Sequence, residues 1–333
     1  MNAPDPVHMD VLRGDIEEAW HRFLDLYEGL RPELYRYCRH LTRSPFEADD
    51  LVQDAMFRGF VTLGCMAEPP PNPRAWLFRV ASNLWIDQVR ARRALPDAAP
   101  ETAPAAEPRE LREAAGTLIA RLSPQERAAV VLKEAFGFSL EEIAEALSTT
   151  PGTVKSALHR GRGKLVEQPD DDEPAPPRPH VLDAFCAAFN AGDLERLTAL
   201  LLAAAEIEVV RVHAEYGPEA ARRGVFQGMM FGPRMLADPA LLPAGVDPEH
   251  VKGLLPEVPR CEARLYRGEW LAVLWYAHAD GEAVRALNRM SVEGDRLARV
   301  RNYFYTPDVL AEVCGELNVP FRSNGSRYWK PTP

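Results

Sequence analysis

The sequence lacks any long apolar run. Among its 333 residues, 26 % of which are charged, no stretch approaches the roughly 18 consecutive apolar residues of a membrane-spanning helix. Its first 15 residues hold acids and prolines, where a secretion signal has a basic start and then an apolar run. We therefore expect a cytoplasmic protein that has no membrane partner.

Cysteines are few, and their spacing pairs none of them. The chain has five, an odd number, scattered at positions 38, 65, 186, 261 and 314. This pattern favours neither a disulfide framework nor a zinc site, and the sequence contains no other metal-ligand motif. We expect reduced thiols that pack in cores, without a metal or a cofactor.

The net charge is −10, but positive charge is concentrated in two places. Residues 74–93 hold five arginines against one acid, and residues 151–166 hold four basic side chains and no acid. Because exposed charges are screened beyond roughly 10 Å, a phosphate backbone responds to such local patches more than to the net charge. Nucleic acid therefore remains a candidate partner.

Two proline-rich segments divide the chain. Residues 95–108 contain four prolines, and residues 168–179 contain five prolines and four consecutive acids. Both compositions favour extended, solvated chain, so we predict linkers there. The predicted domains cover residues 1–94, 109–167 and 180–333, and a length of about 100–200 residues per domain agrees with two or three domains.

The first two domains have helical patterns. Three helix starts share a serine that is followed three residues later by glutamate, at Ser44, Ser123 and Ser139. In such a start the serine caps free backbone amides, and the glutamate reaches back to the cap. We therefore predict that both domains are entirely α-helical.

The third domain has a different pattern, typical of an α+β fold with a mostly antiparallel sheet. A helix is predicted over 180–203, and the segments after it are rich in Val, Tyr, Trp and Leu. Two glycine-containing pairs, at 280–281 and 294–295, favour hairpin turns. The predicted strands cover residues 206–213, 261–267, 270–279, 282–292 and 296–305.

Residues 139–165 predict a helix-turn-helix. The first helix has an apolar stripe, and after a short break a second helix opens at Pro151 with Thr150 as its cap. The second helix of this motif fits the DNA major groove. A plain helical hairpin with a solvated basic face would have the same pattern, so this segment alone leaves both interpretations open.

The amino-acid sequence of this segment is more specific than its helical periodicity. LSPQERAAVVLKEAFGFSLEEIAEALSTTPGTVKSALHRGRGKL, residues 122–165, resembles region 4 of bacterial RNA polymerase sigma factors of the extracytoplasmic-function (ECF) group. The resemblance implies that the second helix reads the minus-35 promoter element. The candidate contacts are Thr153, Lys155, Ser156, His159, Arg160 and Arg162.

An upstream block is similar to another part of the same family. LYRYCRHLTRSPFEADDLVQDAMFRGF, residues 34–60, resembles regions 2.1–2.2, which implies an acidic helix that docks on core RNA polymerase. A solvated acidic helix face would be the alternative if this block stood alone. The candidate polymerase contacts are Asp49, Asp50, Gln53, Asp54 and Phe57.

Residues 73–94, PRAWLFRVASNLWIDQVRARRA, resemble regions 2.3–2.4, which melt and read the minus-10 element. Such a site needs positive charge for one strand and pockets for unstacked bases. Trp76 lies at a helical spacing typical of a core, and residues 64–73 fall where the family captures a flipped base. The candidate contacts are Arg74, Arg79, Asn83, Asp87, Arg90, Arg92 and Arg93.

The third domain opens with HVLDAFCAAFNAGDLERLTALLLAAAEIEVV, residues 180–210, which looks like the start of a SnoaL-like domain. The resemblance, to the nuclear-transport-factor-two-like superfamily, implies a cone with a pocket between helices and a curved sheet. A small apolar ligand, catalysis and a packing domain without ligand all remain open. Candidate pocket residues are His213, Tyr216, Asp238, His278 and Tyr305.

The sequence thus predicts two all-α sigma domains followed by an α+β SnoaL-like cone. The predicted function is that of an alternative sigma factor, not itself an enzyme, which binds core RNA polymerase and promoter DNA and is modulated by its C-terminal domain. The alternative is a DNA-binding regulator fused to a SnoaL-like enzyme that acts on a small molecule. The region 2 block favours the sigma factor, because a plain DNA-binding module would not need it.

Overall fold

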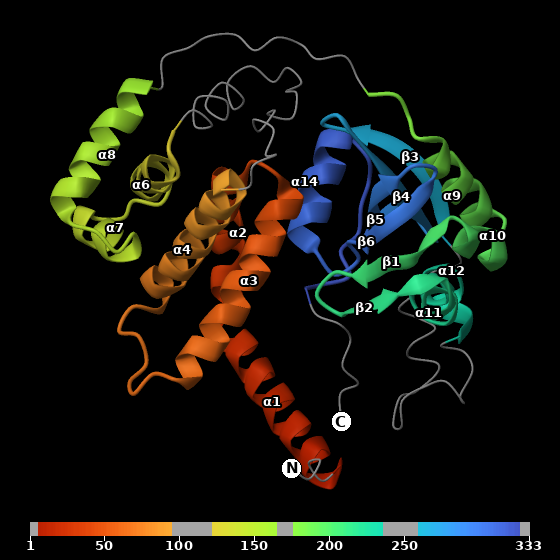
Figure 1. Cartoon of the computed structure of the whole chain (residues 1–333), viewed down its shortest axis with the longest axis horizontal. Helices are drawn as coiled ribbons and strands as arrows, with labels where there is room; N and C mark the ends of the chain where they lie inside the picture. The colour runs from red at the N-terminus through yellow and green to blue at the C-terminus, as the bar shows by residue number, and fades with distance from the viewer. Residues whose placement is uncertain (1–5, 95–121, 165–175, 236–258, 327–333) are drawn as a thin grey trace. The chain divides into compact units, whose positions relative to one another are not determined.

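The computed structural model describes residues 6–94, 122–164, 176–235 and 259–326. The first two ranges form one compact unit, the helical unit, and the last two form another, the sheet unit (Figure 1). The predicted linker at 95–108 lies outside the described residues.

Serine caps begin three helices of the helical unit, as the sequence predicts. Ser123 and Ser139 form complete capping boxes, in which each hydroxyl accepts a backbone N–H and a glutamate accepts the serine N–H. Ser44 accepts the N–H of Glu47. The elements are α1 (Pro6–Tyr27), the 3-10 helix η1 (Glu28–Leu30), α2 (Arg31–Thr42), α3 (Pro45–Gly64), α4 (Pro73–Ala94), α6 (Pro124–Glu134), α7 (Leu140–Ala146) and α8 (Pro151–Lys164).

Aromatic side chains fill the core between α2, α3 and α4. Trp76 is 3 % exposed, which confirms its expected core position. Phe78 stacks on Tyr37 with ring centroids 4.9 Å apart, and the Tyr37 hydroxyl lies 2.7 Å from the Ser82 hydroxyl. Packing, rather than an exposed platform for bases, therefore accounts for these rings.

Residues 122–164 pack against residues 6–94 within the helical unit. Phe138, after α6, is buried beside Phe78 with ring centroids 5.4 Å apart. Arg127 of α6 donates a hydrogen bond to the Leu41 carbonyl at 2.7 Å and lies over the ring of Trp85. The sequence predicts separate domains for these two segments; in the structure they form one compact unit and share these contacts.

The described residues of the sheet unit form six strands in the order β2-β1-β6-β5-β4-β3. All pairs are antiparallel except β1 with β6, which confirms the predicted mostly antiparallel sheet. Gly281 and Gly294 have positive φ angles at the two predicted hairpins. The elements are α9 (His180–Asn190), α10 (Leu194–Ala199), β1 (Leu201–Val209), β2 (His213–Tyr216), α11 (Gly217–Arg223), α12 (Val225–Met235), β3 (Arg260–Tyr266), β4 (Glu269–His278), β5 (Gly281–Glu293), β6 (Arg296–Asn302) and α14 (Pro307–Leu317).

Several boundaries differ from the prediction. The single helix expected over 180–203 is two helices, and β1 already begins at Leu201. Helices α11 and α12 were not predicted. A tertiary contact starts α12: a Glu215 carboxylate oxygen accepts the Val225 N–H at 2.9 Å, and at Gly224 a Cβ would collide with that carboxylate. No local spacing of residues in the sequence predicts this cap.

The last residues of the second predicted linker pack on the sheet unit. Trp270 of β4 donates its indole N–H to the Pro176 carbonyl at 3.0 Å, and the Arg178 guanidinium lies 4.6 Å from the Trp270 ring centroid. Residues 176–179 therefore belong to the sheet unit, and residues 168–175 of this linker lie outside the described part.

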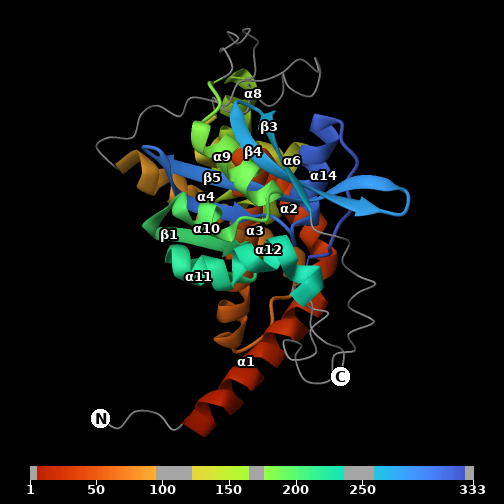
Figure 2. The same cartoon turned by 90° about the vertical axis from the view of Figure 1, so that its right-hand side faces the viewer.

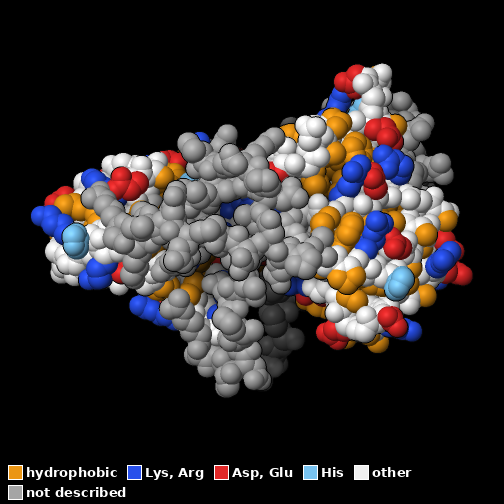
Figure 3. Space-filling model, turned by 90° about the horizontal axis from the view of Figure 1, so that it is seen from above, with side chains coloured by type: hydrophobic (Ala, Val, Ile, Leu, Met, Phe, Trp, Pro, Cys, Tyr) orange, Lys and Arg blue, Asp and Glu red, His pale blue; other side chains and the backbone are white. Residues whose placement is uncertain are grey.

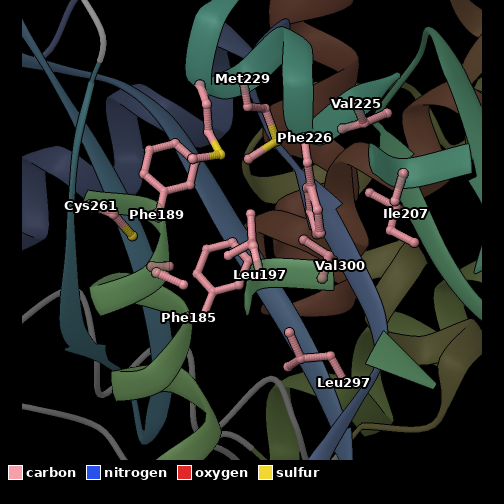
Figure 4. Packing of buried hydrophobic residues seen from close by; sticks show 14 of the residues in the cluster. Phe185, Phe189, Leu197, Ile207, Val225, Phe226, Met229, Cys261, Leu297 and Val300 are labelled. Carbon is pink, nitrogen blue, oxygen red and sulfur yellow. The ribbon is translucent and has the colours of Figure 1, made fainter. Parts of the chain in front are cut away.

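Helices α9, α10, α11 and α12 share a core with the sheet. Figure 2 shows them in front of the strands, and Figure 4 shows Phe226 above Val300, with Phe185 and Phe189 on α9 in the same cluster. Helix α14 contacts β5, and its buried side chains are not part of this cluster. Apolar burial at roughly 25 cal/mol per Å² makes this cluster a main source of the unit's stability.

Candidate nucleic-acid interface

Helix α8 presents a polar outer face. Val154, Ala157 and Leu158 are buried, whereas the intervening residues are exposed. Thr150 caps the helix by accepting the Thr153 N–H at 3.2 Å, as predicted. Figure 3 shows Lys and Arg side chains, with a histidine among them, at the end of the helical unit where α8 lies. The exposed candidates are Thr153, Lys155, Ser156, His159 and Arg160.

Arg160 also has a partner on another helix. Arg160 Nε donates to Glu126 Oε1 at 3.1 Å, and Glu126 is the buried capping-box residue of α6. The Arg160 side chain still exposes 58 % of its surface, so it ties α8 to α6 while part of it faces solvent. The Arg162 side chain lies outside the described residues.

Helix α4 has a polar stripe along one side. Arg79, Asn83, Asp87 and Arg90 are four, four and three residues apart, a spacing that puts them on one helix face. The last three are exposed. Arg79 lies 3.4 Å from Glu145 of α7, a contact between distant segments that the sequence analysis missed. The stripe combines cationic, amide and carboxylate groups, which is the chemistry that reads base edges and phosphates.

The other α4 candidates differ in their surroundings. Arg92 is exposed and lies 3.9 Å from Glu47, and the Arg93 side chain lies outside the described residues. Arg74 donates twice to Glu33 through Nε, at 3.1 and 3.0 Å, and its guanidinium lies 4.3 Å from the Phe138 ring centroid. In this conformation Arg74 is engaged in packing.

Hydrogen bonding by Arg74 lowers the pKa of Glu33, and partial burial opposes the shift. A carboxyl group whose pKa is lower in the folded than in the unfolded protein stabilises the fold at pH values above its unfolded pKa of about 4.3. This stabilisation is lost as the pH falls through the folded pKa. We therefore expect Glu33→Gln to destabilise the helical unit at neutral pH and to have progressively less effect on acidification. Hydrogen exchange of α2 and α4 peptides at several pH values measures this, with the exposed Glu141→Gln as control. An unchanged Glu33→Gln effect at low pH would contradict it.

The predicted polymerase-docking residues on α3 divide into two groups. Asp49 is fully buried, and its carboxylate accepts a hydrogen bond from Arg31 at 3.1 Å, so it is not available to a partner. Its role here is to join α2 and α3, which corrects its predicted place in the contact surface. The remaining candidates, partly or fully exposed, are Asp50, Gln53, Asp54 and Phe57.

The exposed part of α3 also includes an apolar residue that the sequence analysis missed. Val61 lies one turn after Phe57, and the two side chains are 45 % and 60 % exposed. Asp54 accepts a hydrogen bond from Gln88 of α4 at 3.3 Å. The spacing of four was visible in the sequence, but only the fold shows that this side of α3 faces solvent.

Among the described candidate pocket residues of the sheet unit, the two on β2 lie away from His278. His213 and Tyr216 lie on the edge strand β2; Tyr216 is 68 % exposed, and His213 lies 3.2 Å from Glu215. His278 ends β4, and three strands lie between β2 and β4. Burial, together with Arg322 and Arg285, lowers the pKa of His278. Tyr305 follows β6, and Asp238 lies outside the described residues.

Two kinds of feature are absent from the described residues. None of their helices is both long and apolar enough to cross a membrane. Among the same residues no three His, Cys, Asp or Glu side chains gather so as to hold a metal ion.

Two families match the helical unit. Residues 26–95 match the family described as Sigma-70 region 2, and residues 112–165 match Sigma-70, region 4. The chain is 32 % identical over 193 residues to the ECF RNA polymerase sigma factor SigJ of Mycobacterium tuberculosis. That match covers 53 % of this chain and 61 % of SigJ, less than two thirds of the relative.

One solved structure and a second relative are also similar to this chain. The crystal structure of M. tuberculosis SigJ aligns with 86 % of this chain and 97 % of that chain, at 22 % identity and a TM-score of 0.33. The ECF RNA polymerase sigma factor SigM of M. tuberculosis is 32 % identical over 161 residues, which are 47 % of this chain and 82 % of SigM. The chain thus belongs to the family of ECF RNA polymerase sigma factors.

Proposed function

We propose that this protein is an alternative sigma factor that binds core RNA polymerase and directs it to promoters. One observation supports this most: a single chain matches both sigma region 2 and sigma region 4, and both segments expose polar helix faces. A regulator that only binds DNA needs one such face. The polymerase supplies the chemistry of transcription, so the helical unit needs no catalytic group.

In this proposal α8 lies in the major groove of the minus-35 element. Lys155 and His159 supply donors for phosphate oxygens and guanine edges. The Ser156 hydroxyl, which donates to the Gly152 carbonyl at 3.0 Å, would turn toward a phosphate oxygen on binding. Arg160 adds its exposed guanidinium N–H groups while its Nε holds Glu126. Because Glu126 anchors the Arg160 side chain to α6, Arg160 would enter the major groove already oriented.

Helix α4 would hold the opened minus-10 element. Asn83 and Asp87 are exposed and suited to base edges, and Arg90 and Arg92 to phosphates. The α3 surface around Asp54 and Phe57 would dock on the polymerase, where exposed apolar area of this kind marks an interaction site.

The sheet unit is proposed to be SnoaL-like and to modulate the helical unit. A small-molecule ligand is supported by one interior polar group: Asn288 is fully buried and accepts a hydrogen bond from Asn302 at 2.7 Å. Its own amide nitrogen has no hydrogen-bond partner among the described residues. A buried donor of this kind is costly unless something pairs with it.

In vitro transcription with purified core polymerase tests the main proposal. The full-length protein and a truncation at residue 168 would be compared on a promoter library read by sequencing. We expect at least one form to start transcripts at a shared two-element promoter, and the ratio of the two forms measures the effect of the sheet unit. If neither form binds core polymerase or starts transcripts, the regulator fused to a SnoaL-like enzyme takes the place of this proposal.

A single substitution tests the placement of α8. If Lys155 contacts a phosphate, Lys155→Ala should weaken binding about equally for all DNA sequences and reduce the salt slope of log affinity by about 1. Fluorescence anisotropy at several salt concentrations measures the slope. The control is Arg223→Ala, which removes one exposed charge from α11 of the sheet unit and should leave the slope unchanged. An unchanged slope for Lys155→Ala would place this residue outside the DNA interface.

A further inference from the structure

Two cysteines that are distant in the sequence meet in the sheet unit. Cys186 lies on α9 and Cys261 on β3, and their sulfur atoms are 3.3 Å apart. Figure 4 shows the sulfur of Cys261 directed toward the helix that carries Phe185 and Phe189. Both thiols are reduced. A disulfide bond of about 2.05 Å requires the two sulfur atoms to approach by only about 1.3 Å.

Contacts that do not involve sulfur hold the two thiols together. The side-chain amide of Asn190, at the end of α9, donates to the Cys261 carbonyl at 2.9 Å. Its oxygen accepts the Cys261 N–H at 2.7 Å. Because β3 is an edge strand, Asn190 occupies the hydrogen-bonding edge that a neighbouring strand would use. The short distance between the sulfur atoms therefore does not depend on their own weak hydrogen bond.

The two thiols differ in exposure and in acidity. Cys261 is 3 % exposed, whereas Cys186 is only partly buried. Cys261 donates its S–H to the Cys186 sulfur, and this hydrogen bond lowers the pKa of Cys186 and raises that of Cys261. The thiolate is the reactive form of cysteine, so the accessible member of the pair is also the more nucleophilic one.

We propose that Cys186 and Cys261 form a redox-active dithiol that a hydroperoxide oxidises to an intramolecular disulfide. The Cys186 thiolate attacks one peroxide oxygen and the O–O bond breaks, which leaves a sulfenic acid on Cys186 and releases an alcohol, or water from hydrogen peroxide. The Cys261 sulfur then attacks the Cys186 sulfur, and water leaves with the Cys261 proton. In sum, two thiols lose two hydrogens and the peroxide is reduced.

The disulfide would link α9 to β3 across a separation of 75 residues. The closed loop would contain α10, β1, α11 and α12, each of which contributes buried side chains to the core of the sheet unit. A cross-link of this span restricts the unfolded chain, so oxidation should raise the melting temperature of this unit. This inference concerns the sheet unit alone and does not depend on the sigma-factor proposal.

Treatment of the reduced full-length protein with hydrogen peroxide tests the proposal. We expect an intact mass lower by two hydrogen atoms, a linked pair of peptides that contain Cys186 and Cys261, and a higher melting temperature that dithiothreitol reverses. The matched control is Cys65→Ser, which removes an exposed thiol and should leave the cross-link intact. Peroxide that oxidises Cys65 while Cys186 and Cys261 remain thiols would overturn the proposal.

Two variants test the order of the steps. Cys261→Ser should stop at a sulfenic acid on Cys186 that dimedone traps, and Cys186→Ser should leave Cys261 reduced at the same peroxide dose. Dimedone labelling of Cys261 in place of Cys186 would overturn the assigned roles. If one of these variants fails to fold, peptide mapping of the unsubstituted protein still shows whether Cys186 and Cys261 become linked.

Discussion

Asp49→Ala is expected to lower the free energy of unfolding of the helical unit by about 3–5 kcal/mol, the cost of breaking a buried ion pair by removing one partner. Asp49 is fully buried, and Arg31 is 7 % exposed. Their side chains meet at 3.1 Å between the first residue of α2 and the first turns of α3. Without the carboxylate, the Arg31 guanidinium loses this ionic contact in a site that water barely reaches.

Because the chain has two compact units, one unfolding free energy for the whole chain is not well defined. Native-state hydrogen exchange of α2 and α3 peptides reports the local value. The matched control is Asp54→Ala, an acid five residues further along α3, whose hydrogen bond with Gln88 is exposed, so that exchange should be nearly unchanged. We also expect the double variant Arg31→Met/Asp49→Leu to be more stable than Asp49→Ala, because no buried charge is left behind. Equal exchange in Asp49→Ala and Asp54→Ala would contradict this account.

The second large effect is expected at Gly161, where α8 approaches α6. A Cβ at this position would lie 2.7 Å from Val130 Cγ2, and Val130 is buried. Gly161→Val therefore forces apart the two helices that support the exposed face of α8, at a cost of about 2–3 kcal/mol for overpacking. We expect faster exchange in α6 and α8 and weaker promoter binding.

Two further variants distinguish overpacking from a general effect of substitution. Gly152→Ala adds a methyl group to an exposed position of the same helix, 3.9 Å from its nearest neighbour, and should be neutral or slightly stabilising. Val130→Ala should restore part of the stability of Gly161→Val, because it vacates the volume that the new side chain needs. If the two substitutions have independent costs, steric contact with Val130 is not the cause.

The local features of this protein are readable from its sequence. Ser44, Ser123 and Ser139 begin helices because a serine cap acts within one turn. The hairpins at Gly281 and Gly294 form where the sequence predicts them because a turn depends on adjacent residues. Helices α7 and α8 form where an apolar stripe and a short break predict two helices. The family resemblance depends on the same short segments, which the region 2 and region 4 matches cover.

Only the tertiary structure decides which side chain faces which. The sequence places Asp49 and Asp50 side by side on α3, yet Asp49 is buried because Arg31 of another helix lies against it. Arg74 pairs with Glu33, 41 residues away, and Cys186 meets Cys261, 75 residues away. Helix periodicity assigns a residue to a face, but the partner of that face comes from a distant segment. Burial, pKa shifts and the dithiol therefore arise only once the chain has folded.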